Sequence, residues 1–298
     1  MTSPREHAKT FLSAWGIGLD DLVALLPKPV GEEVILLGGS IPEGLANQEA
    51  DIDLIILGAP ERVKGLGIDD GTLSQSVWHD QRNREINTES WTTEQLTELG
   101  ERLHASTAGV LRPRADNKLS SIRAFGELRL LHRARFAVPL VNEAGFEQWR
   151  RKLHLGLFPE YLCTLRLFEH FNFREDFIGE IEQGRTQSAS WISKVVLSEL
   201  AGALLAKKGE TNILLQKWMV PLLQRNASLI GPDVVDSLLY WMSLPISGDL
   251  TPGQADQMLT FCDQAIDQVI NPGFRGKESL STLVELVRLK RRIDPSKL

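Results

Sequence analysis

The chain contains little cysteine, with only Cys163 and Cys262 among its 298 residues. Each lies alone in an apolar, helical-looking context, and neither has a second cysteine at the spacing of a metal or redox motif. This scarcity excludes a disulfide framework and a cysteine-based metal site as the basis of the fold. We expect both thiols to be reduced and to have a structural role.

The chain also lacks an excess of positive charge. It has 33 lysine and arginine residues against 39 aspartate and glutamate residues, which gives a formal net charge of -6. An acidic protein has no overall attraction for a polyanion, so the composition favours a cationic or neutral partner over a nucleic acid. The exception is the segment from Arg112 to Arg135, where seven basic and two acidic residues give a net charge of +5. This segment is either a solvated helix face or a surface that meets a triphosphate.

Long hydrophobic runs are also missing. No apolar run approaches the ~18 residues of a membrane span, and the amino terminus has no charged-then-apolar signal region. We therefore expect a cytoplasmic protein with no membrane partner. With 42% hydrophobic and 24% charged residues the composition is that of a folded protein, and 298 residues suffice for one large domain or two ordinary ones.

The most informative stretch is 34–57, in which two apolar strands are joined by a glycine-rich turn and a polar connection. The second strand carries Asp51 and Asp53. Successive side chains of a strand alternate between faces, so these two carboxylates project from the same side. Two adjacent carboxylates on an apolar strand are unfavourable unless a cation neutralises them. Mg²⁺, which binds one or two carboxylates together with substrate phosphates, meets this need.

The turn before the second strand contains Gly38, Gly39 and Ser40. Glycine lets the backbone approach a phosphate closely, and a serine hydroxyl beside exposed amide groups adds a donor to the same anion site. The sequence therefore predicts a triphosphate site at this turn. A further candidate is Lys217, in a Lys-Trp pair, which either packs over the triphosphate or nucleobase or is a solvated residue at a helix end.

A third carboxylate is expected from the segment 84–91. Glu85, Asn87 and Glu89 alternate there with other residues, so on a strand the three polar side chains share one face. If this strand neighbours the one that carries the aspartate pair, it brings Glu85 or Glu89 to the metal.

The two parts of the chain differ in pattern. Residues 6–26 have the spacing of two short amphipathic helices or one broken helix, apolar strands follow, and Thr92 or Thr93 has the position of a helix N-cap. From about residue 116 helical periodicity continues almost throughout. The sequence therefore predicts an α+β protein, with a mixed-sheet domain over residues 1–115 and a mainly α-helical domain over residues 116–298.

These motifs resemble the core of the polymerase-beta-type nucleotidyltransferase superfamily. More narrowly, they are similar to its small bacterial branch, which includes aminoglycoside nucleotidyltransferases and minimal nucleotidyltransferase domains. The resemblance lies within residues 34–91, in the order Gly-Gly-Ser, ten further residues, Asp-Ile-Asp and a later strand with an acidic residue. It implies a nucleotidyltransferase domain followed by a helical acceptor-binding domain. Ala50 is a departure, because the family often has serine before the first aspartate, but it removes no metal ligand.

The resemblance also implies roles for individual residues. Gly39 and Ser40 would hold the nucleoside triphosphate. Asp51 and Asp53 would bind the metal and act in catalysis. Glu89 is the better match for the third metal-binding and catalytic carboxylate, in preference to the other glutamate of its strand.

The implied activity is Mg²⁺-dependent transfer of a nucleoside monophosphate to a hydroxyl group with release of pyrophosphate. AMP from ATP is the first choice of donor, and two Mg²⁺ ions ~3.5–4 Å apart assist such an in-line displacement. The first choice of acceptor is a small molecule such as an aminoglycoside-like antibiotic. The alternatives are a macromolecular acceptor, such as a tRNA end or a protein side chain, and a non-catalytic regulatory protein that binds nucleotide. The sequence leaves open the acceptor, the preferred triphosphate, the catalytic base and the oligomeric state.

Overall fold

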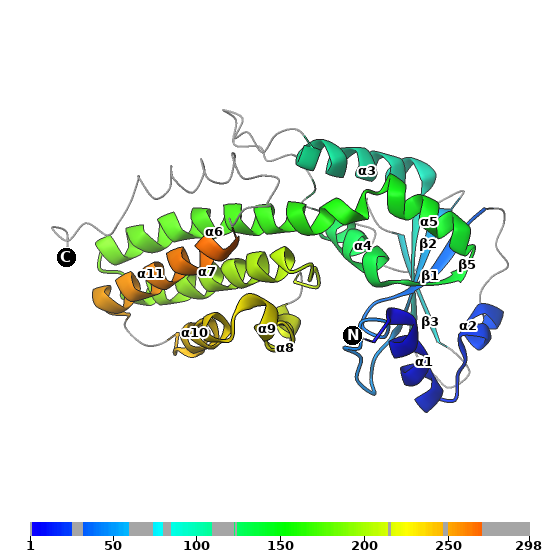
Figure 1. Cartoon of the computed structure of the whole chain (residues 1–298), viewed down its shortest axis with the longest axis horizontal. Helices are drawn as coiled ribbons and strands as arrows, with labels where there is room; N and C mark the ends of the chain where they lie inside the picture. The colour runs from blue at the N-terminus through cyan, green and yellow to red at the C-terminus, as the bar shows by residue number, and fades with distance from the viewer. Residues whose placement is uncertain are drawn as a thin grey trace. The chain divides into compact units, whose positions relative to one another are not determined.

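The fold is α+β, with a mixed sheet followed by a mainly helical part, as predicted (Figure 1). The computed structural model describes residues 2–25, 32–59, 74–79, 85–108, 122, 124–213, 216–246 and 250–269. The chain divides into two compact units, which we call the sheet unit and the helical unit. The sheet unit comprises Met1–His104 and Ser120–Gly156, and the helical unit comprises Ala105–Leu119 and Leu157–Leu298.

Within the described residues, the sheet unit contains five strands in the order β3-β4-β2-β1-β5. They are β1 (Val34–Gly38), β2 (Ile52–Ala59), β3 (Ser74–His79), β4 (Glu85–Thr92) and β5 (Val138–Val141). β2 and β4 are parallel, and the other neighbouring pairs are antiparallel, so the sheet is mixed. β1, β2 and β4 confirm the three strands expected around the sequence motifs.

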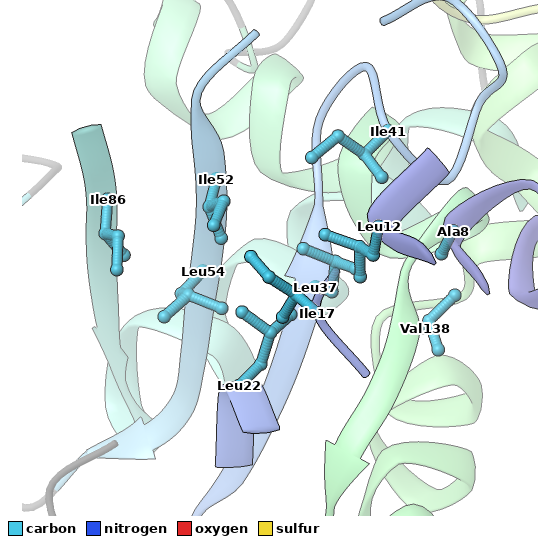
Figure 2. Close-up of a cluster of buried hydrophobic side chains, with 10 residues drawn as sticks. All are labelled: Ala8, Leu12, Ile17, Leu22, Leu37, Ile41, Ile52, Leu54, Ile86 and Val138. Atoms are coloured by element: carbon cyan, nitrogen blue, oxygen red, sulfur yellow. The ribbon is translucent and has the colours of Figure 1, made fainter. Parts of the chain in front are cut away.

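One face of the sheet is apolar and covered by the amino-terminal helices. These are α1 (Pro4–Ala14) and α2 (Leu19–Leu25), which confirm the two short helices expected there. Their apolar side chains pack with those of β1, β2 and β4, among them Leu37, Leu54 and Ile86 (Figure 2). Burying each side chain of this size contributes ~1.5–3 kcal/mol, so this cluster fixes which face of each strand points inward.

The opposite face of the same strands carries the acidic residues. Asp53 and Glu89 lie on it, because side chains alternate along each strand and the parallel register places Asp53 of β2 opposite Asn87 of β4, two residues before Glu89. Two helices, α4 (Phe125–Phe136) and α5 (Glu143–Lys152), pack against β1. Arg133 of α4 contacts both carboxylates, so α4 lies on this face.

α3 (Thr93–Ala108) follows β4 directly and begins at the predicted cap. The amide of Gln95 donates to Oγ1 of Thr92 at 3.3 Å, and the amide of Thr92 donates to Oε1 of Gln95 at 3.0 Å. This reciprocal pair of hydrogen bonds is a capping box, which satisfies two amide donors at the start of the helix.

The helical unit is dominated by two long helices, α6 (Phe158–Glu182) and α7 (Thr186–Lys207), which pack against each other. The shorter helices are α8 (Met219–Arg225), α9 (Ala227–Ile230), α10 (Pro232–Ser243) and α11 (Pro252–Val269). Two 3-10 turns, η1 (Leu155–Leu157) and η2 (Gln216–Trp218), precede α6 and α8. Among the described helices, α7 is long and apolar enough to cross a membrane, yet 67% of its apolar window is buried inside the structure. The core helix of a globular protein has the same composition.

The two units do not divide the chain at a single position, because Ala105–Leu119 belongs to the helical unit and the later segment Ser120–Gly156 to the sheet unit. β5 pairs with β1, with Val138 opposite Leu37. Ser120–Gly156 therefore belongs to the sheet unit, although the sequence assigns residues from 116 onward to a helical domain. The physical reason is the length of β5. A four-residue strand between two helices has too few positions for its alternation to be distinguished from helical periodicity.

Candidate functional site

The glycine-rich turn and the second aspartate meet at the end of β1. Gly38 is opposite Asp53 in the antiparallel register of β1 and β2. The next residue, Gly39, has a φ of +72°, and a Cβ built on it would lie 2.0 Å from Oδ2 of Asp53. Glycine is therefore required here both by the backbone conformation and by the space that the carboxylate occupies. Ser40 follows with a half-buried side chain, and its carbonyl oxygen accepts a hydrogen bond from the amide of Leu45 at 3.0 Å.

The other acidic residues are arranged around Asp53 in different ways. Asp51 immediately precedes β2 and is exposed. Asn87 of β4 is opposite Asp53, and Glu89 lies two residues further along β4 on the same face. Glu85 is half-buried at the first position of β4. The structure thus brings Glu89 to the side of the sheet on which Asp53 lies.

Arg133 joins the carboxylates of Asp53 and Glu89. Its Nη2 donates to Oδ1 of Asp53 at 3.0 Å, and its Nη1 donates to Oε2 of Glu89 at 3.0 Å. A planar guanidinium can serve two acceptors at once, so a single side chain connects both. Burial opposes the charge of Arg133, but the carboxylates of Glu89, Asp53 and Glu43 outweigh it and raise the pKa of the guanidinium above its usual value. Arg133 is therefore a fixed positive charge between the two acids.

Glu89 is surrounded by protein donors, and its side chain is only 1% exposed. Besides Arg133, Nη2 of Arg129 lies 3.2 Å from Oε2 of Glu89. The other oxygen, Oε1, accepts a hydrogen bond from Nε1 of Trp91 at 3.4 Å. These groups compensate the buried carboxylate for the water that it has lost.

A second buried pair connects α4 with the segment after the glycine-rich turn. Oε1 of Glu43 lies 3.0 Å from Nε2 of His132, and the two side chains are 3% and 5% exposed. His132 is adjacent to Arg133 in the sequence. The same part of α4 therefore contacts both the turn region and the carboxylates of the sheet.

The acidic side chains fit Mg²⁺ in part. Hard oxygen ligands from one or two carboxylates, completed by substrate phosphates, are the usual site for this ion. Asp51 is exposed, and Asp53 lies against the glycine-rich turn, so these two would hold the ion. Glu89 does not fit in this arrangement, because both of its oxygens face protein donors. In the part of the chain that the structure describes, no group of three or more His, Cys, Asp or Glu side chains is arranged to hold a metal.

Lys217 belongs to the helical unit and lies in η2 with an exposed side chain. Its Nζ lies 5.0 Å from the centroid of the Trp218 ring, a cation–π contact within the Lys-Trp pair noted in the sequence. The contacts of Lys217 are those of the helical unit, and its role toward a nucleotide stays a prediction.

α4 supplies the site residues to which sequence reasoning gave no individual role: Arg129, His132 and Arg133. The signal was the local positive charge of the segment 112–135, which left two interpretations open. Arg129 and Arg133 are only 19% and 15% exposed, so the interpretation as a solvated helix face is wrong for these two positions. The basic residues Arg112, Arg114, Lys118 and Arg123 lie outside the described residues.

Comparison with known proteins gives little beyond this geometry. No family model and no curated protein matches the sequence. Among solved structures, the chain is similar to a nucleotidyltransferase-like protein from Exiguobacterium sibiricum 255-15. The two share 15% identity over 97% of this chain and 81% of that chain, with a TM-score of 0.43. At that TM-score the likeness carries no argument about chemistry, so the function must be inferred from the residues of this chain.

Proposed function

We propose that this protein is a nucleotidyltransferase whose active site is formed by the turn after β1 and the acidic residues at the start of β2. The observation that carries the proposal is the approach of Gly39 to Asp53, with a positive φ and no room for a side chain beside the carboxylate. A glycine turn beside a carboxylate is suited to a metal-bound polyphosphate, because glycine lets the backbone approach a phosphate closely. The amides of such a turn can bind the phosphate oxygens while the carboxylate binds the metal.

In this proposal Asp51 and Asp53 hold Mg²⁺. When bound, Mg²⁺ neutralises charge on the triphosphate and lowers the pKa of the acceptor hydroxyl, and two ions are the usual number in such transfers. ATP is the proposed donor.

The proposed reaction is an in-line displacement at the α-phosphorus of the nucleoside triphosphate. The acceptor hydroxyl oxygen forms a bond to this phosphorus, the bond to the oxygen that bridges to the β-phosphorus breaks, and pyrophosphate leaves. The hydroxyl proton passes to a base. Gly38, Gly39 and Ser40 position the phosphates, and Lys217 is a further proposed contact. Fixed positioning and charge stabilisation provide most of the acceleration.

The proposed acceptor is a small molecule with hydroxyl groups, such as an aminoglycoside-like antibiotic. A net charge of -6 favours a cationic acceptor over a polyanion such as tRNA.

The test is a transfer assay with purified protein, Mg²⁺, each labelled nucleoside triphosphate and a panel of aminoglycosides, tRNA and protein acceptors. We expect pyrophosphate release with a small hydroxyl acceptor, and a rate at least about 100-fold lower for Asp53→Asn, because removing a group that stabilises transition-state charge has an effect of this size. Asp20→Asn removes an exposed carboxylate of α2 in the same unit and is the matched control, with an unchanged rate.

The alternatives give different results in the same assay. A wild-type rate in Asp53→Asn overturns the mechanism. If only tRNA or a protein accepts the nucleotide, the acceptor is a macromolecule and not a small molecule. Nucleotide binding without transfer to any acceptor favours the non-catalytic regulatory protein.

A further inference from the structure

We propose that Glu89 is the buried anchor of a two-arginine phosphate site, and not a metal ligand. The site consists of Glu89, Arg129 and Arg133, and its ligand is the polyphosphate chain of the nucleotide. This inference rests on the proposed function, because it assigns the phosphates to α4 and the metal to Asp51 and Asp53.

Both carboxylate oxygens of Glu89 face protein donors. Oε2 lies 3.0 Å from a guanidinium nitrogen of Arg133 and 3.2 Å from one of Arg129, and Oε1 faces Nε1 of Trp91. A metal ion at Oε2 would have to displace a guanidinium group. The displaced guanidinium group, which has little solvent exposure, would then lack its carboxylate partner, and this is strongly unfavourable. Glu89 is therefore better suited to hold arginines than to hold a metal.

Arg129 keeps donors for another anion. Within the described residues, Nε and Nη2 of Arg129 are buried and make no hydrogen bond, although Nη2 lies 3.2 Å from Oε2 of Glu89. Buried donors without hydrogen bonds are costly, and charge-assisted bonds to phosphate oxygens would satisfy them. Arginine is the residue best suited to this, because its planar fork matches the geometry of a phosphate.

Arg133 lies beside the glycine-rich turn. The Cβ of Arg133 lies 3.7 Å from where a Cβ on Gly38 would be, so the stem of this arginine contacts the first glycine of the turn. Arg133 also binds Asp53, which lies against Gly39. The guanidinium group of Arg133 thus lies beside the turn at which the triphosphate is expected, and Glu89 fixes its orientation from below the surface.

Metal binding by the full chain separates the two roles of Glu89. Mn²⁺ is the probe, measured by its paramagnetic signal with Glu89→Gln, Asp53→Asn and wild type. We expect the Mn²⁺ dissociation constant of Glu89→Gln to stay within about threefold of wild type, and that of Asp53→Asn to rise by about tenfold or more, which corresponds to losing one charged ligand interaction. An equally large rise in the Mn²⁺ dissociation constant of Glu89→Gln overturns the inference. If the Mn²⁺ affinity is unchanged in both variants, the result agrees with the role assigned to Glu89 but overturns the proposed metal site, and with it the proposed function.

Binding of tripolyphosphate in the presence of a metal chelator tests the arginines. We expect wild type to bind it, and Arg133→Gln and Glu89→Gln to bind it about tenfold more weakly, because each loses a charge-assisted contact or its anchor. Arg150→Gln, which removes an exposed arginine of α5, is the matched control with unchanged binding. Unchanged binding in Arg133→Gln, or no binding by wild type, overturns the inference.

A third variant covers the case in which Glu89→Gln does not fold, as judged by circular dichroism. Arg133→Lys keeps the charge, but an ammonium on a flexible stem does not reproduce the fork that joins Asp53 to Glu89. We expect it to bind tripolyphosphate several-fold more weakly while its Mn²⁺ affinity stays within about threefold of wild type. Wild-type tripolyphosphate binding by Arg133→Lys contradicts the inference.

Discussion

Glu43 and His132 are 89 residues apart in the sequence, yet their side chains meet at 3.0 Å and are almost completely buried. The pair joins the segment after the glycine-rich turn to α4, the helix that carries Arg129 and Arg133. Removing one partner would leave the other buried without this interaction, so the pair requires both groups. It thereby fixes the position of the turn relative to the arginines.

The first prediction concerns this pair. We expect Glu43→Ala and His132→Ala each to lower the free energy of unfolding by about 2 kcal/mol, because each leaves a buried polar group without this hydrogen bond. The double variant should lose clearly less than the sum of the two, because both single substitutions remove the same interaction. Urea unfolding of the four proteins measures the difference. Strict additivity would mean that the two side chains do not stabilise each other.

The second prediction concerns the turn. Gly39→Ala should abolish nucleotide binding, because its Cβ would lie 2.0 Å from Oδ2 of Asp53 and would displace that carboxylate. Gly184→Ala is the matched control, since Gly184 has a similar φ of +69° and nothing within 4 Å of a built Cβ. The control should lose only about 1 kcal/mol of stability from backbone strain and should bind nucleotide normally. Binding by Gly39→Ala at wild-type affinity would contradict the proposed site.

Local patterns were sufficient to predict the parts of the site that depend on strands and turns. Alternation predicted which polar residues share a face within each strand, and the pairing of β2 with β4 then puts Asp53 and Glu89 on one side. The glycines indicated a close approach of the backbone. Both signals depend on the chemistry of a few consecutive residues. They are therefore visible in the sequence before any tertiary contact is known.

The contribution of α4 could not be predicted in the same way. Charge counting identified a basic segment, but a count does not tell which arginines turn inward. Arg133 contacts Asp53 across 80 residues of sequence and Glu89 across 44. Such contacts are decided by how the helix packs on the sheet. The same contacts change the interpretation of Glu89, whose residue type alone is equally consistent with a metal ligand and with a partner for arginine.

The third prediction concerns the two cysteines, which lie on α6 and α11 of the helical unit. Cys163 and Cys262 are free and buried, and burial raises the pKa of each thiol to about 12. A thiol-specific reagent at roughly pH 8 should label neither cysteine in the folded protein, because the reactive thiolate is almost absent and inaccessible. Both should react once the protein is unfolded in denaturant. Rapid labelling of either cysteine in the folded protein would contradict the structural role expected for it.

The last prediction uses His170, on α6 of the helical unit, whose side chain is fully buried. Nδ1 lies 2.9 Å from the carbonyl oxygen of Val196, which fixes it as the donor nitrogen in the neutral ring. Burial, helped by the charge of Arg174, lowers the pKa of His170 from 6.5 to about 4, although the bond to Val196 and the charge of Asp263 act in the opposite direction. The folded protein therefore prefers the neutral imidazole.

The free energy of unfolding should consequently decrease as the pH falls from 6.5 to about 4. Above pH 6.5 the imidazole is neutral in both the folded and the unfolded states. Between 6.5 and about 4 the unfolded chain binds a proton that the folded protein does not bind, so the free energy of unfolding decreases, by about 3 kcal/mol at most. His170→Asn keeps an N–H donor near the Val196 carbonyl but does not titrate. The test therefore measures urea unfolding of both proteins at several pH values. The difference in the free energy of unfolding between wild type and this variant should decrease as the pH falls through that window. The acid sensitivity of all other groups is common to both proteins and cancels in the difference. A difference that stays constant with pH would mean that His170 is not held neutral by its burial.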